Sequence, residues 1–298
     1  MARVSSEQEK SEKLPVVSSV AEFLDFVREE VNPDCTFIYR GQVAKKRTEE
    51  GMVFSTVLMP SLYRQGLPTP RIGLDEMERR LLHDFKRECR PYIAQQPTSE
   101  AEWMMLAQHY GLPTRLLDWT FNPLAALFFA VENEQQPYDS HVYQGKVYDY
   151  QIYGVQDEKN LADVDTYLRK RFGYDLEKDV FQLIVPPHFD ERIQAQAACF
   201  TLHPLFEDFG DRNEMLTLFG KTLPFELGAR TCLVPATQFR SIKAELYALS
   251  ISHKTMFPGL DGLCKSIAWR NTGERDFLQK LGRIFQRSAS ERETPPGG

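Results

Sequence analysis

The sequence lacks the short motifs by which several large enzyme classes are recognised. It has no Gly-x-Ser-x-Gly elbow for a nucleophilic serine, no Gly-x-x-x-x-Gly-Lys-Ser/Thr loop and no Gly-x-Gly-x-x-Gly after a strand. Its five cysteines are scattered without a Cys-x-x-Cys pair, and its six histidines show no metal-ligand spacing. These absences argue against elbow-type serine hydrolases, P-loop ATPases and Rossmann enzymes, and they predict that no metal is bound.

The chain also has little that would direct it to a membrane or to DNA. No apolar run approaches the ~20 residues of a membrane span, and no signal peptide is visible. The formal net charge of −6 argues against non-specific binding to DNA, although it leaves RNA or a nucleotide in a local pocket open. The odd number of unpatterned cysteines is typical of a reducing compartment. We therefore expect a cytoplasmic protein without a membrane partner.

Composition predicts one domain between two polar ends. Residues 1–15 are rich in Ser, Glu and Lys, residues 288–298 are equally polar, and we expect both segments to be disordered. Residues 16–287 form the predicted domain, because no linker or repeat divides them. Within it, a charged insertion near 156–180 is either a helical flap beside a cleft or a surface feature.

Hydrophobic periodicity predicts an α+β fold. Helices are expected at Ser19–Glu30, capped by Ser18 or Ser19, at Gly73–Arg90 and at Gln238–Leu249. The charged face of the second helix mixes acidic and basic residues, which favours a solvated surface over a phosphate-binding one. Strands are expected at 145–153, 181–185 and 231–234. The order of the elements favours a single domain with a mixed, mainly antiparallel sheet and flanking helices.

The densest group of polar residues lies in the segment from Gln108 to Thr120. Gly111-Leu112-Pro113 forms a turn, and a short buried strand follows with Asp118 at its end. Thr120 or Asn122 then caps an apolar helix that begins near Pro123. This pattern places Asp118 at a strand-to-helix junction and indicates a functional site. The alternative is a structural ion pair between Asp118 and Arg115, with Thr120 acting only as a cap.

A second candidate segment runs from Phe37 to Gln42. It reads as a buried strand that ends in Arg40, with Gly41 leaving room for a ligand to approach the backbone. The planar guanidinium of an arginine suits a phosphate or a carboxylate. Taken alone, a surface arginine after a strand is equally compatible with no function.

Together these segments resemble the FRG-domain family, which is named for an aromatic-Arg-Gly sequence. The resemblance covers roughly residues 20 to 270 and rests on five motifs. They are Tyr39-Arg40-Gly41-Gln42, Met59-Pro60-Ser61-Leu62-Tyr63-Arg64, the block from Gln108 to Ala130, Arg192-Ile193 with Gln196 and Phe200, and Met256–Leu263. One residue departs from the family pattern, because Ala198 replaces the glycine of Gln-x-Gly-x-Phe; an alanine fits there if its φ is negative.

The order of the motifs also resembles the three sites of ADP-ribosyltransferases of the Arg-first type. That resemblance implies that Arg40, with Tyr39, Gly41 and Gln42 beside it, holds the diphosphate of NAD. It implies further that the residues from Asp118 to Thr120 lie beside the nicotinamide and that Gln196 takes the third place, where such enzymes have a glutamate or glutamine. The Gln/Glu-x-Glu sequence of arginine-modifying transferases is missing here.

The chemistry of this scheme assigns roles to the remaining residues. Cleavage of the nicotinamide–ribose bond develops an oxocarbenium-like cation, which Asp118 would stabilise, and His109 is the candidate general base or, alternatively, a helix-end histidine bonded to backbone. Trp119 or Tyr39 would stack on the nicotinamide, and Arg115 would bind the second phosphate or pair with Asp118.

Two functions from different classes follow from the sequence. The first is a protein that binds NAD and transfers ADP-ribose to a protein or RNA, or hydrolyses NAD, with a toxin or phage-defence effector as a further alternative. The second is a non-catalytic module of the same fold that binds a nucleotide or a partner protein. A glutamate in the cleft, from Glu191, Glu207 or Glu214, would favour the enzyme; a cleft with only Gln196 and apolar residues would favour the module.

Overall fold

The structure is a computed structural model of the chain. It describes residues 14–30, 32–43, 58–63, 74–93, 96–135, 137–148, 152–154, 182–186, 190–203 and 229–272. Of the predicted segment 1–15 only residues 14 and 15 are described, and Pro15 accepts a hydrogen bond from the backbone of Leu233. The predicted insertion near 156–180 and the tail 288–298 lie outside the described residues.

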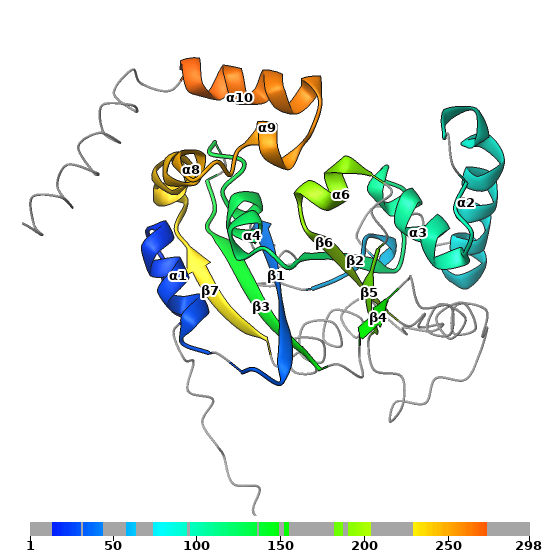
Figure 1. Ribbon diagram of the computed structural model, residues 1–298, viewed down its shortest axis with the longest axis horizontal. Helices are drawn as coiled ribbons and strands as arrows, with labels where there is room; N and C mark the ends of the chain where they lie inside the picture. The colour runs from blue at the N-terminus through cyan, green and yellow to red at the C-terminus, as the bar shows by residue number, and fades with distance from the viewer. Residues whose placement is uncertain are drawn as a thin grey trace, which may run out of the picture.

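A seven-stranded sheet forms the centre of the molecule, in the order β4-β5-β6-β2-β1-β3-β7 (Figure 1). The strands are β1 (Cys35–Val43), β2 (Leu116–Thr120), β3 (Ser140–Tyr148), β4 (Ile152–Gly154), β5 (Gln182–Val185), β6 (Ala198–Leu202) and β7 (Arg230–Val234). Neighbouring strands are antiparallel, except that β4 pairs in parallel with β5. The prediction of an α+β fold with a mixed, mainly antiparallel sheet is confirmed.

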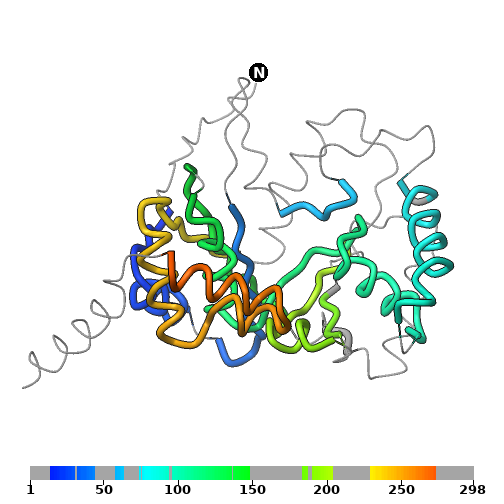
Figure 2. Tube along the Cα trace, turned by 90° about the horizontal axis from the view of Figure 1, so that it is seen from above, coloured from blue at the N-terminus to red at the C-terminus, as the bar shows by residue number. Residues whose placement is uncertain are grey.

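Helices cover the sheet in two groups, with α2 at one end of the molecule and α1 and α8 at the other (Figure 2). The longer helices are α1 (Val20–Arg28), α2 (Leu74–Glu88), α3 (Glu100–His109), α4 (Pro123–Ala130), α8 (Phe239–Ala248) and α10 (Leu260–Thr272). Shorter pieces are α6 (Glu191–Ala195), α9 (His253–Met256), η2 (Ser61–Tyr63), η3 (Arg90–Tyr92) and η5 (Ala236–Gln238). None of these described helices has the length and apolar character needed to span a membrane.

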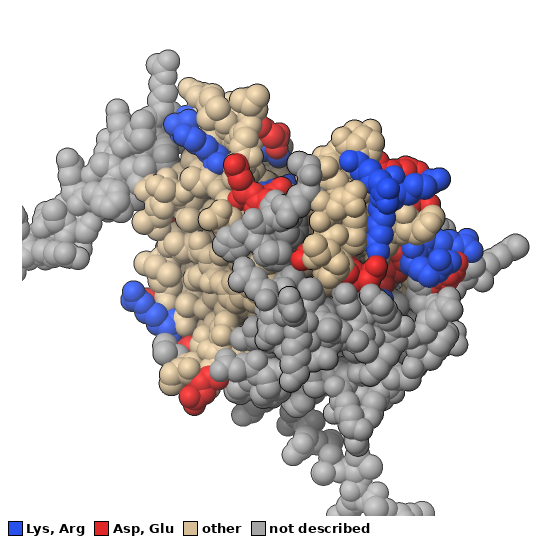
Figure 3. Space-filling model, turned by 45° about the vertical axis from the view of Figure 1, so that its right-hand side comes forward, with Lys and Arg blue, Asp and Glu red and all other residues tan. Residues whose placement is uncertain are grey.

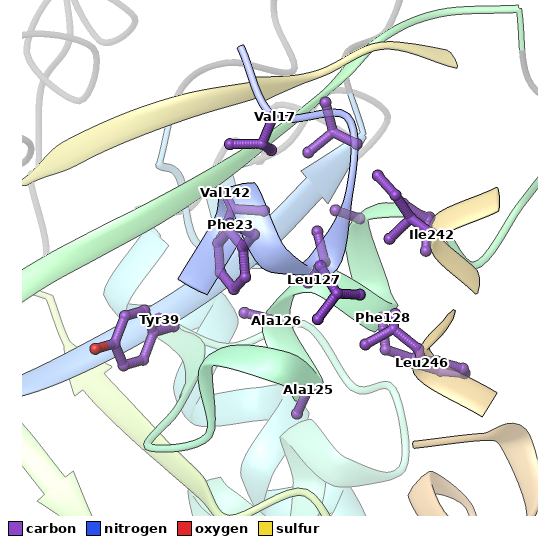
Figure 4. Packing of buried hydrophobic residues seen from close by; sticks show 14 of the residues in the cluster. Val17, Phe23, Tyr39, Ala125, Ala126, Leu127, Phe128, Val142, Ile242 and Leu246 are labelled. Atoms are coloured by element: carbon purple, nitrogen blue, oxygen red, sulfur yellow. The ribbon is translucent and has the colours of Figure 1, made fainter. Parts of the chain in front are cut away.

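The largest core lies between the sheet and helices α1, α4 and α8 (Figure 4). Helix α4 is apolar on every side, as expected for a helix buried between a sheet and other helices. Asn122 caps it by accepting hydrogen bonds from the backbone of Leu124 and Ala125, and Ser19 caps α1 in the same way through Glu22. Both caps were among the predicted alternatives.

Two smaller clusters complete the packing. Helix α3 packs on the β2 and β6 half of the sheet, and its Met104 and Met105 lie in one cluster with Leu116 and Phe200. A third cluster lies on the opposite face of the sheet, because successive strand residues point to opposite sides. It contains Ile38, Leu58, Leu117, Trp119, Tyr143, Val147, Leu183 and Cys199.

The charged face of α2 carries ion pairs between neighbouring side chains, as expected for a solvated face. Arg79 and Arg80 bind Glu76 and lower its pKa to about 2. Basic and acidic side chains lie intermixed in this part of the surface (Figure 3).

The strand predicted at 145–153 was placed too late, because β3 already begins at Ser140. The first half of β3 lacks the apolar pattern of a buried strand, because two of its buried residues, Ser140 and Gln144, are polar. Both lie where β3 pairs with β1 and β7.

Candidate functional site

The candidate site lies where the pairing of two central strands stops. Strand β1 pairs with β3 along its whole length, but its register with β2 consists of one pair, Tyr39 with Thr120. Beyond that pair, the Arg40 side chain reaches β2: its Nη1 donates to the backbone carbonyl of Asp118 at 2.6 Å, and its Nε donates to Gln42 at 3.3 Å. The Arg40 side chain thus donates a hydrogen bond to a carbonyl of β2 at the point where the backbone pairing of β1 with β2 ends. Arg40 is the sixth residue of β1 rather than its last, which corrects the prediction.

Asp118 presents a carboxylate from the middle of a strand that is otherwise buried. Its side chain is 54% exposed, whereas its four neighbours in β2 are buried. Oδ2 lies 3.0 Å from Nε2 of Gln108 and 3.8 Å from Nη1 of Arg40. The expected strand-to-helix junction is wrong, because β2 continues to Thr120 before α4 begins. An arginine and an amide, rather than the first amides of a helix, therefore face this carboxylate.

Gln108, at the end of α3, is held in place by hydroxyl groups. Its Oε1 accepts hydrogen bonds from Thr114 at 2.6 Å and from Ser61 at 3.4 Å. The amide nitrogen consequently faces β2, where it donates to Asp118. Ser61 is fixed in turn by the backbone of Thr114, which donates to it at 3.1 Å. The network orients one donor toward the exposed carboxylate.

His109 follows Gln108 and contacts a carboxylate from another element. Its side chain is 12% exposed, and its Nε2 lies 3.4 Å from Oδ1 of Asp190, the residue that caps α6. Burial lowers the pKa of His109; Asp190 and Asp118 oppose that shift, and Arg192 adds to it. The imidazole is therefore neutral at pH 7, and Asp190 favours the tautomer that carries the proton on Nε2. The contact with a carboxylate, rather than with backbone, distinguishes His109 from a helix-end cap.

Gln196 connects two elements at the edge of this group. It caps the end of α6, and its side-chain Nε2 donates to the backbone carbonyl of Met256 at 2.9 Å. Its backbone carbonyl accepts a hydrogen bond from the Thr120 hydroxyl at 2.6 Å. Ala198 begins β6 and does not have a positive φ, whereas its neighbour Ala197 has φ 45°. The replacement of the family's glycine by Ala198 therefore requires no strain.

Several predicted site residues belong to the framework instead. A Cβ on Gly41 would lie 1.9 Å from the carbonyl oxygen of Ala126, so the group that approaches this glycine is helix α4 and not a ligand. Tyr39 is 6% exposed in the core beside α4, and Trp119 is 3% exposed with its Nε1 donating to Thr201. Neither ring is available to a nicotinamide at the surface.

Arg115 and Thr120 are likewise structural. Arg115 does not pair with Asp118; it forms a buried ion pair with Glu78 of α2, with Nε 2.7 Å from Oε2. Thr120 is buried, accepts from the backbone of Asn122 and donates to Gln196, and so supports the turn into α4. Glu78 lies four residues after Leu74 and four before Leu82, so the helical period could have placed it on the apolar face of α2.

The sequence drew attention to Gln108 without assigning it a role, and it missed Asp190. Gln108 donates a hydrogen bond to Asp118, ten residues later in the chain, and neither a helical nor a strand period brings residues that far apart into contact. Asp190 could be recognised as a helix cap before Glu191, but its contact with His109 depends on where the fold places the start of α6 relative to the end of α3. Glu191 is exposed on α6, and Glu207 and Glu214 lie outside the described residues. Within the described ranges, no group of three or more His, Cys, Asp or Glu is arranged to hold a metal.

Comparison with known families agrees with the motifs. The model of the FRG domain matches residues 36–139, a range that contains Arg40, the Gln108–Thr120 segment and α4. Comparison with curated proteins and with solved structures finds no significant match.

Proposed function

Because the chain carries an FRG domain at residues 36–139, we propose that this domain binds NAD at the break between β1 and β2 and cleaves the nicotinamide–ribose bond. ADP-ribose then passes to a hydroxyl group of a macromolecule or to water. One observation carries the proposal: Arg40 of β1 and Gln108 of α3 face the exposed carboxylate of Asp118 in a buried strand, and the charge of that carboxylate acts on the pKa of His109. A carboxylate and a cation kept together beside a neutral histidine are typical of a reactive site rather than of a core.

Arg40 would hold the diphosphate of NAD. Its guanidinium is oriented by the Asp118 carbonyl and by Gln42, and its side chain is 13% exposed. An oriented guanidinium loses little conformational entropy when it binds an anion, and it offers a planar set of donors that matches phosphate oxygens. Arg115 contributes nothing here, because Glu78 already neutralises it.

Asp118 would stabilise the transition state. When the C1′–N bond breaks, its electron pair leaves with the neutral nicotinamide, and positive charge develops on the ribose. A carboxylate held next to that charge lowers the barrier without forming a bond. Because Gln108 and Arg40 position Asp118 in the free protein, little reorganisation is required at the moment of reaction.

His109 would act as the general base. The acceptor hydroxyl forms a new bond from its oxygen to C1′ and releases a proton, which the neutral imidazole takes up. The lowered pKa of His109 keeps the ring unprotonated at neutral pH, and Asp190 stabilises the imidazolium that results. With water as the acceptor, the same steps hydrolyse NAD.

A non-catalytic module that binds a nucleotide is the second candidate, and a specific observation favours it. The amide nitrogen of Gln196 is engaged by Met256, and the rings of Tyr39 and Trp119 are buried, so three residues expected in the NAD site have structural roles. In that reading Arg40 and Asp118 recognise a nucleotide, and His109 only packs against Asp190.

The test is incubation of the purified protein with NAD labelled in its ADP-ribose part, followed by chromatography for free nicotinamide. We expect release by the native protein and strongly reduced release by Asp118→Asn, which keeps the shape of the side chain but removes its charge. Asp84→Asn, an exposed aspartate of α2, is the matched control and should retain full release. Binding of NAD without release would support the module, and absence of both would refute the proposal.

Arg40 is tested by affinity for NAD in the absence of turnover. Arg40→Lys retains the charge but loses the planar donors, so its affinity should fall with little loss of thermal stability. Arg240→Ala, an exposed arginine on α8, should leave the affinity unchanged. Equal affinity of the native protein and Arg40→Lys would remove Arg40 from the site.

A further inference from the structure

An exposed aromatic ring stands next to the proposed general base. Tyr110, directly after α3, is 67% exposed, and its ring meets the His109 ring edge-on with centroids 5.1 Å apart. Gly111 has φ 88°, which lets the chain turn away after the tyrosine. Exposed aromatic rings are suited to stacking on nucleobases, because every base has a π-face.

An exposed cation lies close enough to the same histidine for its charge to lower the pKa of the imidazole. Arg192 of α6 is exposed, and its Cζ lies 4.5 Å from the centroid of Phe257. In the part of the chain that the structure describes, no ion pair involves Arg192, although its charge acts on the pKa of His109. A guanidinium stacked on a ring keeps its N–H donors in its own plane, past the edge of the ring, where they can bind an anion.

Asp190 contacts both the histidine and the backbone of the arginine. Its Oδ1 lies 3.4 Å from Nε2 of His109 and accepts a hydrogen bond from the backbone nitrogen of Arg192 at 2.7 Å. The stacking ring, the proposed base and the cation therefore follow one another along the ends of α3 and α6. An aromatic ring beside a guanidinium is the combination with which proteins bind unpaired nucleotides, the ring taking the base and the cation the phosphate.

We infer that this surface, formed by Tyr110, His109 and Arg192, binds a nucleotide of single-stranded RNA as the acceptor of the proposed reaction. The inference rests on the proposed function for the transfer step but not for the binding. RNA carries a 2′-hydroxyl on every nucleotide, whereas DNA has hydroxyl groups only at its ends. A base stacked on Tyr110 brings a ribose hydroxyl next to His109, which removes its proton as the oxygen bonds to C1′ of the ADP-ribosyl group.

The charge of the protein sets the expected strength of the salt dependence. With a formal net charge of −6, attraction over the whole surface is absent, and binding depends on the local contacts. One phosphate on Arg192 corresponds to a slope of about −0.7 in log affinity against log salt for a single strand. A protein that binds through a basic surface would give a much steeper slope.

The first test measures binding of a short fluorescein-labelled oligouridine by anisotropy, without NAD. Tyr110→Ala should weaken binding by about tenfold through loss of stacking, whereas Tyr110→Phe should bind like the native protein. Arg192→Ala should weaken binding and bring the salt slope close to zero. Tyr92→Ala, which removes another exposed ring, and Arg240→Ala, which removes another exposed charge, are the matched controls. Native affinity in Tyr110→Ala or in Arg192→Ala would overturn the inference.

The second test separates this inference from the reaction itself. Labelled NAD is incubated with the protein and with oligouridine, oligodeoxythymidine or unfolded casein, and both nicotinamide and labelled acceptor are measured. Label on the oligouridine that Tyr110→Ala reduces is the expected result. Nicotinamide release with label on casein alone would overturn the RNA acceptor and leave the NAD reaction intact. RNA binding without any nicotinamide release would refute the proposed reaction but not the binding surface.

Discussion

Replacing Arg115 with alanine should destabilise the fold and leave affinity for NAD nearly unchanged at temperatures where the protein is folded. Arg115 and Glu78 are 6% and 2% exposed, so both charges are removed from water. Glu78 accepts from Nε of Arg115 at 2.7 Å and from the backbone nitrogen of the same residue at 3.1 Å. The variant leaves this carboxylate with the backbone donor but without a countercharge.

The size of the effect follows from burial. Removing one partner of a buried ion pair costs about 3–5 kcal/mol, because the remaining charge stays unpaired in the interior. Arg87, which pairs with Glu88 and Asp84, provides the comparison: all three side chains are more than half exposed, and such pairs are worth about 0–1 kcal/mol. Arg115→Ala should therefore lower the free energy of unfolding several-fold more than Arg87→Ala does.

Urea unfolding measures this difference through the midpoint and the slope of the transition. The double variant Arg115→Met/Glu78→Leu should recover most of the stability, since a buried pair is replaced well by apolar side chains of similar size. If Arg115→Ala were as mild as Arg87→Ala but abolished binding of NAD, Arg115 would bind a phosphate of NAD rather than stabilise the fold through Glu78.

Three further predictions concern the framework of the site. Gly41→Ala should lower the melting temperature, at a cost of about 1–3 kcal/mol, because the new methyl group meets the backbone of Ala126, which cannot move independently of α4; an unchanged melting temperature would contradict the close packing. Asn122→Ala should cost about 1 kcal/mol in urea unfolding through loss of the α4 cap, and Asn122→Asp should restore it. Burial lowers the pKa of His203 from 6.5 to about 3, so the unfolded chain binds a proton that the folded chain does not. Stability should therefore fall by up to about 1.4 kcal/mol per pH unit as the pH drops from 6.5 toward 3, and unfolding curves of His203→Gln should lack this part of the slope.

The parts of the fold that sequence could predict are those fixed by near neighbours. Ser19 and Asn122 bond to amides two or three residues away, so their roles as caps are visible in the local sequence. Helix α2 and strands β5 and β7 follow from periods of a few residues. The start of β3 was missed for the opposite reason: burial of Ser140 and Gln144 depends on strands far away in the chain.

The partners of the site residues join distant segments and could not be predicted. Arg115 meets Glu78 across 37 residues, and Arg40 meets Asp118 across 78. The types of residue were recognised as chemically active, but the choice of partner decides whether a charge is neutralised in the interior or presented at the surface. One alternative from the sequence paired Arg115 with Asp118, whereas the structure gives each of them a different partner.

The alternation of strand β2 explains why one short motif serves both framework and site. Leu117 and Trp119 point to one face of the sheet and fill a core there, whereas Asp118 points to the other face beside Phe200. On that face α3 covers one half of the sheet and α4 the other, and Asp118 remains exposed. The adjacent buried residues fix the backbone from which this carboxylate projects. Substitution of Trp119 should therefore affect function only through stability, whereas substitution of Asp118 should affect function directly.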